Sequence, residues 1–480
     1  MRCRPLSFAG LLACAAPAVA DAPPALQDRV ATILRAAGPG TRFGLVLLDD
    51  AGREIVAIAP DDRFVPASNT KIFTTAAAFD ALGDVTRPDV AAGASVRMDG
   101  RDVILTGNGD ARLSSDPGCA ADCLSTLADA IATHATRVHD VVGDDTVFPD
   151  ERWSPGMSWN NIATRSGTGV SALTLDDNEL RLVVTPAPDR HGAASIAAPD
   201  YYAIDGHVVT GGRTAIRIDR LPGSRRLRIT GTIAPGAPAE VLRVGIDDPA
   251  DYAAWRLRQM LVARGVRVTG AIRVRHRAAG ANDDPAIRGN APVAHAPAPP
   301  PPLARAVPRP LVEDLKLTST VSQNLHAELL LRRIGRVTGS GSIADGQVRV
   351  AALLARAGVE RWRYDLVDGS GMSSYNRVSP RATVRFLRWT QAQPWGAAWR
   401  ATLPVGGIDG TLRRRFAATP LAGRLNAKTG TLNGASALSG FMTARSGRTL
   451  TFASYANDMP ADVSVTDAID AALLLVAASQ

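Results

Sequence analysis

The 480-residue chain contains very little lysine, although it is rich in positive charge. Its three lysines, Lys71, Lys316 and Lys428, stand among 54 lysine and arginine residues. Arginine is effectively always protonated, whereas a partly buried lysine can lose its proton and act as a base. The scarcity excludes lysine as a routine surface charge, so the short motifs around Lys71 and Lys428 become candidates for chemistry.

Long apolar runs are missing beyond the N-terminus, which excludes a transmembrane segment from the mature chain. The N-terminus itself has the layout of an export signal. Arg2 and Arg4 precede an apolar stretch that begins at Leu6, and residues 18–20 form a small-x-small cleavage site. We therefore predict a signal peptide over residues 1–20 and a periplasmic protein. Lipoprotein anchoring at Cys14 is the alternative.

Cysteine is also scarce, with four in the chain. Cys3 and Cys14 lie in the predicted signal, so the mature protein keeps Cys119 and Cys123. A close, isolated pair in an exported protein predicts a local disulfide. A metal site would need further ligands nearby, and the seven histidines show no metal-binding spacing. We expect no metal and no cofactor, and we assign His326 a structural role.

The charge balance is moderately basic, with a formal net charge of +8. Such a surface can favour anionic partners. The charges are dispersed, however, and the chain has no RNA-recognition motif, basic helix or interleaving of aromatic and basic residues. We therefore predict an arginine-rich surface and no nucleic-acid partner. The length allows two or three domains, and the apolar content of 46% is typical of a folded protein.

Residue patterns predict a sheet with helices that uses both ends of the chain. Alternating and β-branched runs predict strands over 41–47, 54–59, 424–431, 435–443 and 449–454. Helical patterns cover 68–82, 311–334, 343–357 and 462–478. The middle, from 86 to 285, has many short strand-like runs and one helix over 249–264. The Ala- and Pro-rich stretch 291–310 favours polyproline II.

Ser68 and Lys71 are three residues apart at the start of a predicted helix, so they share one face. A desolvated lysine can take the serine proton, and the helix N-terminus favours the developing alkoxide. By itself the Ser-x-x-Lys match is a weak signal. Ser68 as a helix cap and Lys71 as a solvated residue are the alternative.

Two further motifs follow in the C-terminal half. Ser322 could relay a proton between two lysines, and the amide of Asn324 could hold Lys71 and a substrate carbonyl. Lys428 and Thr429 offer a charge and a hydroxyl to a substrate carboxylate, and Gly430 lets a substrate backbone approach the strand. Alone, the Ser322 motif is better explained as an ordinary polar helix segment, and the alternative for Lys428 is a surface lysine in a turn. The order of the three motifs, their predicted secondary structure and the scarcity of lysine together make the combination specific.

These three motifs resemble the Ser-x-x-Lys, Ser-x-Asn and Lys-Thr-Gly signatures of penicillin-binding proteins and serine β-lactamases. The chain is also similar to the D-alanyl-D-alanine carboxypeptidase/endopeptidase family, the class C low-molecular-mass penicillin-binding proteins. That similarity rests on residues 66–71, 74–77, 322–325, 327–330, 368–371, Asn376, Pro380, 403–404 and 410–412. The gap from Ser68 to Ser322 exceeds half of the chain, as expected for this family's large insertion.

The resemblance implies an α/β (α+β) β-lactamase/transpeptidase-like domain, with an antiparallel sheet flanked by helices and a large, mostly β insertion. We predict the transpeptidase-like domain over 21–85 and 286–480. One inserted domain would cover 86–180 and 243–285, and a second, nested one would cover 181–242.

The resemblance also implies a reaction on peptidoglycan stem peptides and cross-links. Ser68 would form an acyl-enzyme, Lys71 would be the base, and Ser322 would pass the proton to the leaving amine. Lys428 and Thr429 would bind the terminal carboxylate, while the backbone amides of Ser68 and Thr431 would form the oxyanion hole. β-Lactam antibiotics would acylate Ser68 as inhibitors.

Two positions depart from the family pattern, since Arg is common where Ser374 stands and Gln where Asn433 stands. Both border the side-chain end of the substrate, so recognition of the stem peptide is expected to differ. In the insertion, Asp144 and Phe148 resemble a segment that faces the cleft. Asp144 would pair with a substrate ammonium, or it is a solvated turn residue.

Two other functions compete with this interpretation. A serine β-lactamase-like hydrolase would need an added carboxylate for fast deacylation, and no clear Glu-x-x-Leu-Asn segment occurs. A non-catalytic peptidoglycan-binding or β-lactam-sensing protein would tolerate loss of Lys71 or Lys428, and this chain keeps both. The oligomeric state does not follow from the sequence.

Overall fold

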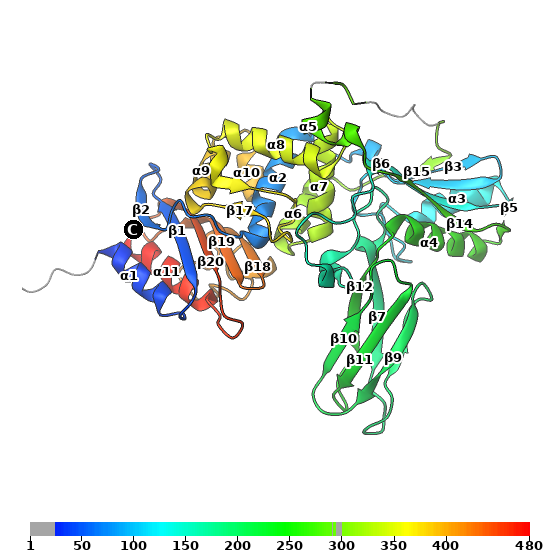
Figure 1. Ribbon diagram of the computed structural model, residues 1–480, viewed down its shortest axis with the longest axis horizontal. Helices are drawn as coiled ribbons and strands as arrows, with labels where there is room; N and C mark the ends of the chain where they lie inside the picture. The colour runs from blue at the N-terminus through cyan, green and yellow to red at the C-terminus, as the bar shows by residue number, and fades with distance from the viewer. Residues whose placement is uncertain (1–24, 290, 294–299) are drawn as a thin grey trace, which may run out of the picture.

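A five-stranded antiparallel sheet joins the two ends of the chain in the computed structural model (Figure 1). The structure describes residues 25–289, 291–293 and 300–480. The predicted signal peptide and Cys14 lie outside these residues. The strand order is β18-β19-β20-β1-β2. The strands are β1 (Arg42–Leu48), β2 (Glu54–Ile58), β18 (Leu425–Leu432), β19 (Ala435–Thr443) and β20 (Thr449–Asn457).

Helices cover both faces of this sheet because its strands alternate apolar side chains between two cores. Leu45 and Leu47 of β1 belong to one core, and Val46 and Leu48 belong to the other. The first core is closed by α1 (Leu26–Arg35) and α11 (Thr466–Ser479). The second is closed by α2 (Thr70–Ala81), α6 (Leu311–Thr320), α7 (Asn324–Arg336), α8 (Ile343–Arg356), α9 (Pro380–Gln391) and α10 (Gly396–Arg400). A short pair, β16 (Tyr364–Asp365) and β17 (Arg377–Val378), lies beside them.

The insertion leaves this body after α2 and has a separate hydrophobic core. Its first sheet has the order β14-β6-β4-β3-β15. The elements are β3 (Ser95–Asp99), β4 (Asp102–Thr106), α3 (Leu124–His134), β6 (Val141–Pro149), α4 (Pro249–Ala263), β14 (Ile272–Arg277), α5 (Pro285–Arg288) and β15 (Ala304–Arg305), with the pair β5 (Arg137–Val138) and β13 (Arg267–Val268).

Two three-stranded sheets extend away from α4 and form the lower part of the molecule in Figure 1. One has the order β12-β7-β8, with β7 (Glu179–Thr185), β8 (Ser195–Ala197) and β12 (Glu240–Gly245). The other has the order β10-β11-β9, with β9 (Ala203–Thr210), β10 (Ala215–Asp219) and β11 (Arg226–Ile233).

The predicted architecture of a helix-flanked sheet with a mostly β insertion is confirmed. The numerical domain boundaries stay predictions. The pairing of β15 with β3 shows, however, that the insertion's sheet extends to residue 305. Every helix in the described ranges is too short or too polar to cross a lipid bilayer.

One expected helix is wrong. The apolar pattern over 311–334 predicts a single helix that stops at Gly335, but the structure has two helices, α6 and α7. Ser322 separates them with φ +61°, a left-handed conformation that a continuous helix cannot contain. Gly335 lies inside α7, where its missing side chain allows close contact with Gly346 and Asp345 of α8.

Helices α1, α3, α5, α9 and α10 are not anticipated by the sequence interpretation. For α9 the local signal is nevertheless clear, because Ser379 caps the backbone N–H of Ala382 at 3.2 Å and Pro380 occupies the first turn. Within the stretch 291–310, where polyproline II is expected, residues 294–299 lie outside the described structure and β15 pairs with β3.

Candidate active site

The serine of the first motif lies in a strained turn before the helix. Ser68 belongs to the 3₁₀ helix Ala67–Asn69, and α2 begins at Thr70 rather than at Ser68. Ala67 has φ +47°, which costs about 1–3 kcal/mol for a non-glycine residue and is typical of functional turns. This turn leaves Ser68 half-buried, and the Nζ of Lys71 donates a hydrogen bond to its Oγ over 2.9 Å.

Lys71 is fully buried and is held by two more acceptors. Its Nζ donates to Oδ1 of Asn324 over 2.7 Å and to the backbone carbonyl of Ser370 over 2.6 Å. Lys71 and Asn324 are 253 residues apart in the chain. The amine is therefore aimed at Ser68 by groups from two other segments.

The second amine is equally buried and contacts the second serine. The Nζ of Lys428 donates to Oγ of Ser322 over 2.9 Å and to the backbone carbonyl of Thr429 over 2.9 Å. The left-handed backbone of Ser322 turns its hydroxyl toward β18 at the break between α6 and α7. The structure thus brings all five residues expected to be catalytic into one site: Ser68, Lys71, Ser322, Asn324 and Lys428.

Burial makes both amines easier to deprotonate. Desolvation lowers the pKa of Lys71 to about 7, although the nearby carboxylates of Asp368 and Glu328 act in the opposite direction. Desolvation lowers the pKa of Lys428 well below its usual value, and repulsion from Lys71 adds to the effect. The nearby carboxylates therefore favour a proton on Lys71 over one on Lys428.

Two buried carboxylates shape the loop that carries the Ser370 carbonyl. Glu328 accepts hydrogen bonds from the backbone N–H groups of Gly369 and Ser370 at 3.0 and 2.9 Å. Asp368 accepts from the N–H groups of Gly371 and Ser373 at 2.9 and 2.7 Å. Desolvation, followed by repulsion from Glu328, raises the pKa of Asp368 to about 6. These carboxylates lie outside the expected catalytic set, although their segments contribute to the family resemblance.

Two glycines permit close packing around Ser68. At Gly371, with φ +86°, an added Cβ would lie 1.9 Å from the backbone oxygen of Ala67. At Gly430 a Cβ would lie 2.6 Å from the oxygen of Pro66. Gly430 is expected to make room for a substrate backbone. The structure adds a different need, because β18 must pack against the Ser68 turn.

The remaining predicted substrate residues in the transpeptidase-like body surround this region. Thr429 donates to Oγ1 of Thr411 over 2.8 Å, and Thr431 is exposed on β18. Asn433 is exposed in the turn between β18 and β19. Ser374 is exposed, and both its N–H and its Oγ donate to the carbonyl of Gly156 at 3.0 Å. Ser374 therefore contacts the insertion.

The structure does not support cleft-facing roles for Asp144 and Phe148. Phe148 is 2% exposed and shares a small apolar cluster with Leu325 and Leu329 of α7, so its ring packs the insertion against α7. The Oδ1 of Asp144 accepts from the N–H and the hydroxyl of Thr146 at 3.1 and 2.7 Å. This carboxylate, 9% exposed, is occupied within its own turn.

A later part of the insertion reaches the catalytic groups instead. The backbone carbonyl of Ser166 accepts a hydrogen bond from Nδ2 of Asn324 over 2.9 Å. Met157 pairs with Ser373 through an isolated β-bridge, next to the Gly156–Ser374 contact. Sequence reasoning missed these residues because they act through backbone atoms, which residue type does not reveal.

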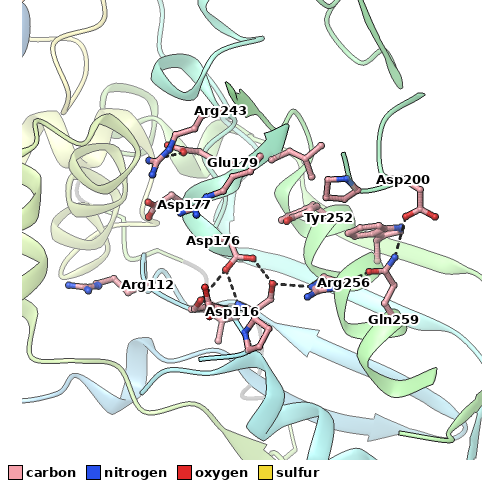
Figure 2. A pocket seen from close by; sticks show the side chains of 18 of the residues that line it. Arg112, Asp116, Asp176, Asp177, Glu179, Asp200, Arg243, Tyr252, Arg256 and Gln259 are labelled. Carbon is pink, nitrogen blue, oxygen red and sulfur yellow. Dashed lines mark hydrogen bonds and ion pairs between the residues drawn. The ribbon is translucent and has the colours of Figure 1, made fainter. Parts of the chain in front are cut away.

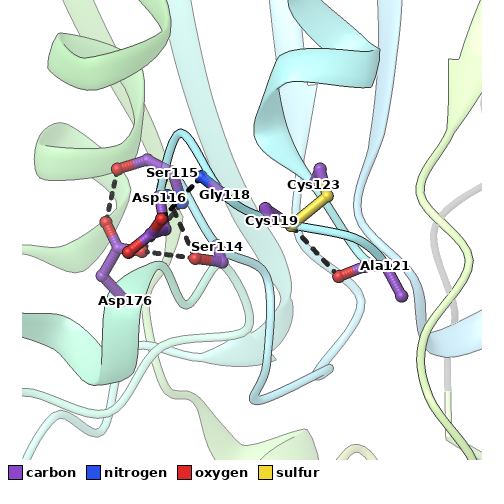
Figure 3. The surroundings of a disulfide bond; sticks show 8 residues. All are labelled: Ser114, Ser115, Asp116, Gly118, Cys119, Ala121, Cys123 and Asp176. Atoms are coloured by element: carbon purple, nitrogen blue, oxygen red, sulfur yellow. Dashed lines mark hydrogen bonds between the residues drawn. A yellow bond between two sulfur atoms is a disulfide. The ribbon is translucent and has the colours of Figure 1, made fainter.

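The predicted disulfide between Cys119 and Cys123 is present (Figure 3). It lies beside the loop of Ser114 and Ser115, which is tied to Asp176 by three hydrogen bonds of 2.6–3.1 Å. The bridge therefore closes a loop of the insertion and is not part of the catalytic cluster.

One group of side chains in the described residues has metal-ligand atoms within 4.8 Å of one another, namely Asp102, His139 and Asp140. The carboxylate of Asp140 already accepts from the N–H of Ala271 at 2.7 Å and from Arg273 at 3.1 Å. The group lies at the start of β4 and in the turn before β6, away from the catalytic residues, and we assign no metal to it.

Comparison with known proteins finds a matching family and relatives that are similar over most of the chain. Residues 26–480 match the family described as D-Ala-D-Ala carboxypeptidase 3 (S13). The chain is 33% identical to a D-alanyl-D-alanine carboxypeptidase from an Actinomadura species, over 95% of this chain and 86% of that protein. It is 24% identical to D-alanyl-D-alanine carboxypeptidase DacB from Haemophilus influenzae, over 87% of this chain and 86% of that protein.

The fold is shared with a solved structure. The crystal structure of penicillin binding protein 4 from Haemophilus influenzae superposes with a TM-score of 0.76 at 21% identity, covering 93% of this chain and 97% of that one. A second structure of that protein, complexed with a β-lactam, has a TM-score of 0.72 at 20% identity, covering the same 93% and 97%.

Proposed function

Because the chain belongs to the D-Ala-D-Ala carboxypeptidase 3 (S13) family, we propose that it hydrolyses D-Ala-D-Ala ends and D-amino-acid cross-links of peptidoglycan stem peptides. It is a serine-type carboxypeptidase and DD-endopeptidase whose acyl-enzyme forms on Ser68. The observation that carries this assignment is the contact of 2.9 Å between Nζ of Lys71 and Oγ of Ser68, in a site where burial lowers the pKa of the amine to about 7.

Acylation starts with proton transfer from Ser68 to the neutral amine of Lys71. The alkoxide attacks the carbonyl carbon before the terminal residue, and the backbone N–H groups of Ser68 and Thr431 stabilise the oxyanion. Ser322 donates its hydroxyl proton to the departing amine as the C–N bond breaks, and the proton that Lys71 took from Ser68 replaces it, so that Lys71 is neutral again. The products of this step are an ester on Ser68 and a free D-amino acid, or the released strand of a cross-link.

Substrate binding places a terminal carboxylate at Lys428 and Thr429. This contact stabilises the protonated form of Lys428, whose pKa is low in the free protein because it is buried beside another amine. Water then hydrolyses the ester and restores Ser68. Ser374 and Asn433, which border the site on the sides of the insertion and of β18, are proposed to contact the stem peptide.

The site would also accept β-lactams, since an acyl group on Ser68 is the common product. A periplasmic location follows from the peptidoglycan substrate and from the export layout of residues 1–20. The similarity to a penicillin binding protein crystallised with a β-lactam supports this proposal through the shared fold.

The function is tested by mass spectrometry of the intact protein after exposure to benzylpenicillin, followed by digestion of purified cross-linked muropeptides. We expect one added penicilloyl group on the peptide that contains Ser68. We also expect release of D-alanine and of uncross-linked monomers. Rapid release of hydrolysed penicillin would favour a β-lactamase, and acylation without muropeptide cleavage would favour a sensor.

A further inference from the structure

A buried histidine connects the first turn of α7 to two other parts of the molecule. His326 is the third residue of α7, two positions after Asn324, and its side chain is fully buried. Its Nδ1 is hydrogen-bonded to Oδ1 of Asp314 in α6. Its Nε2 is hydrogen-bonded to Oδ1 of Asp177 in the insertion, over 2.8 Å. One imidazole thus bridges α6, α7 and the insertion.

The ring is cationic in this setting. Burial alone lowers the pKa of His326, but the charges and hydrogen bonds of Asp314 and Asp177 outweigh it and raise the pKa to about 10. The pKa of Asp177 is lowered, despite burial, by His326 and by the guanidinium groups of Arg243 and Arg112. His326 therefore donates from both ring nitrogens at neutral pH, and each carboxylate accepts one hydrogen bond.

The insertion presents Asp177 in a fixed position. Asp176, Asp177 and Asn178 have φ values of +50°, +57° and +50°, a run that persists only where surrounding contacts hold it. Asp176 accepts hydrogen bonds from the Ser114 and Ser115 loop (Figure 3). The side chain of Asn178 donates to the carbonyl of Gly169 over 2.9 Å and accepts from the N–H of Leu175 over 3.1 Å.

The other side of Asp177 faces open space. It lines a cavity of about 590 Å³, beside Glu179 and Arg243, which pair at 3.2 Å (Figure 2). Its side chain is 37% exposed. A substitution at Asp177 is therefore less disruptive than one at His326 and offers an independent way to break the link.

The same turn of α7 is tied to the insertion at a second point. The side chain of Asn324 donates to the carbonyl of Ser166 and accepts from Lys71. Immediately before it, Ser322 adopts a left-handed conformation and accepts from Lys428. The position of both catalytic groups depends on how the start of α7 is anchored, and His326 is a buried side chain of this turn that is hydrogen-bonded to both α6 and the insertion.

We propose that His326 is a positioning residue for acylation of Ser68. Its two hydrogen bonds hold the first turn of α7 so that Asn324 meets Lys71 and Ser322 meets Lys428. The inference rests on the proposed function. It gives the insertion a part in positioning the catalytic groups, because Asp177 and Ser166 both belong to it.

The test compares the second-order rate constant for acylation by a fluorescent penicillin in His326→Phe, His326→Gln and the unchanged protein. We expect His326→Phe to lower the rate about 10- to 100-fold, as small misplacements of catalytic groups do. His326→Gln keeps one hydrogen-bond donor and should recover part of the rate. Each value is divided by the folded fraction from thermal unfolding.

His276→Phe is the matched control. His276 in β14 also bridges two carboxylates, Asp145 at 2.9 Å and Asp248 at 3.2 Å, and its pKa is also about 10. Its hydrogen-bond partners lie within the insertion and include no catalytic residue. We expect the acylation rate of this variant to stay within about twofold of the unchanged protein, because none of these hydrogen bonds reaches a catalytic residue.

Asp177→Asn supplies a readout that a purely structural role would not move. The asparagine can still accept a hydrogen bond, but the pKa of His326 falls because one of its two carboxylates is gone. In the unchanged protein His326 keeps its proton up to about pH 9. In the variant, the acylation rate should decline again at the alkaline end as His326 loses its proton.

The proposal is overturned if folded His326→Phe acylates within twofold of the unchanged protein, or if His326→Phe and His276→Phe lose the same amount of activity. If the His326 variants do not fold, Asp177→Asn decides alone: an unchanged rate and pH profile overturn the proposal. Failure of penicillin to acylate the unchanged protein would instead remove the proposed function.

Discussion

The Nζ of Lys428 donates a hydrogen bond to Oγ of Ser322 over 2.9 Å, across 106 residues of chain. This contact joins the strand that is expected to bind the substrate carboxylate to the serine that is expected to protonate the leaving group. Ser68 and Lys71 form the parallel pair at the same distance. The site therefore consists of two amine–hydroxyl pairs, and the amine of each pair is easier to deprotonate because it is buried.

Ser68→Ala should abolish covalent labelling by fluorescent penicillin. Among the described residues, the side chain of Ser68 has one hydrogen bond, from Lys71, and Lys71 keeps Asn324 and Ser370 as acceptors. The free energy of unfolding should therefore change by less than about 0.5 kcal/mol. Intact-mass analysis and thermal unfolding check both statements. Labelling at the unchanged rate would refute Ser68 as the nucleophile.

The acylation rate should depend on pH through Lys71. Its pKa is about 7, and only the neutral amine accepts the serine proton, so the rate should rise as pH increases through about 7 and then level off. Stopped-flow labelling between about pH 5 and pH 9 measures this profile. A rate that falls over the same interval would contradict the role of Lys71.

Lys71→Arg should be inactive over that whole pH range, because a guanidinium does not lose its proton. Lys316→Arg is the matched control, since this lysine is exposed on α6 and a charged arginine replaces it without change of sign. Both variants are compared by penicillin labelling and D-alanine release. Turnover by Lys71→Arg near the unchanged rate would exclude Lys71 as the base.

Gly371→Ala should damage the site by pushing on the Ser68 turn. The new Cβ would lie 1.9 Å from the oxygen of Ala67, and φ of +86° adds backbone strain. We expect a loss of about 1–3 kcal/mol in the free energy of unfolding together with slower acylation. Gly358→Ala is the control, because Gly358 has φ +72° and open space around it, so it should lose stability alone.

Loss of the Cys119–Cys123 bridge should weaken the fold and spare the site. The closed loop is short, so the double variant Cys119→Ser with Cys123→Ser should lose about 2 kcal/mol of unfolding free energy. Penicillin labelling at a temperature where the variant is folded should be unchanged. A reduced labelling rate there would indicate that the 114–123 loop acts on the site through Asp176.

Many helices and strands can be predicted from the sequence because their signals come from residues that are close together in the chain. The alternation in β1 and the helical pattern of α8 depend on neighbours along the chain, and both elements fall within a residue or two of expectation. The break between α6 and α7 at Ser322 cannot be predicted in this way. Its left-handed backbone contradicts the apolar pattern of 311–334, and its side chain accepts a hydrogen bond from Lys428, which is 106 residues away and outside any local window.

The site shows the same division. Ser68, Lys71, Ser322, Asn324 and Lys428 are recognisable because their side-chain types and spacing carry the chemistry. Asp144 and Phe148 are misplaced as cleft residues, because burial by α7 and a local turn cannot be read from their types. Ser166 acts through its carbonyl, and every residue type has one.

The amino-acid sequence alone determined which groups are available to this protein: two lysines that can be deprotonated, two serines, an asparagine, and the helices and strands that carry them. Only the tertiary structure decided that the two amines are buried, which lowers their pKa values. It also decided that Asp177 of the insertion is hydrogen-bonded to His326 in the first turn of α7. The reason is physical. Desolvation and hydrogen-bond geometry depend on segments that lie far apart in the chain and become neighbours when it folds.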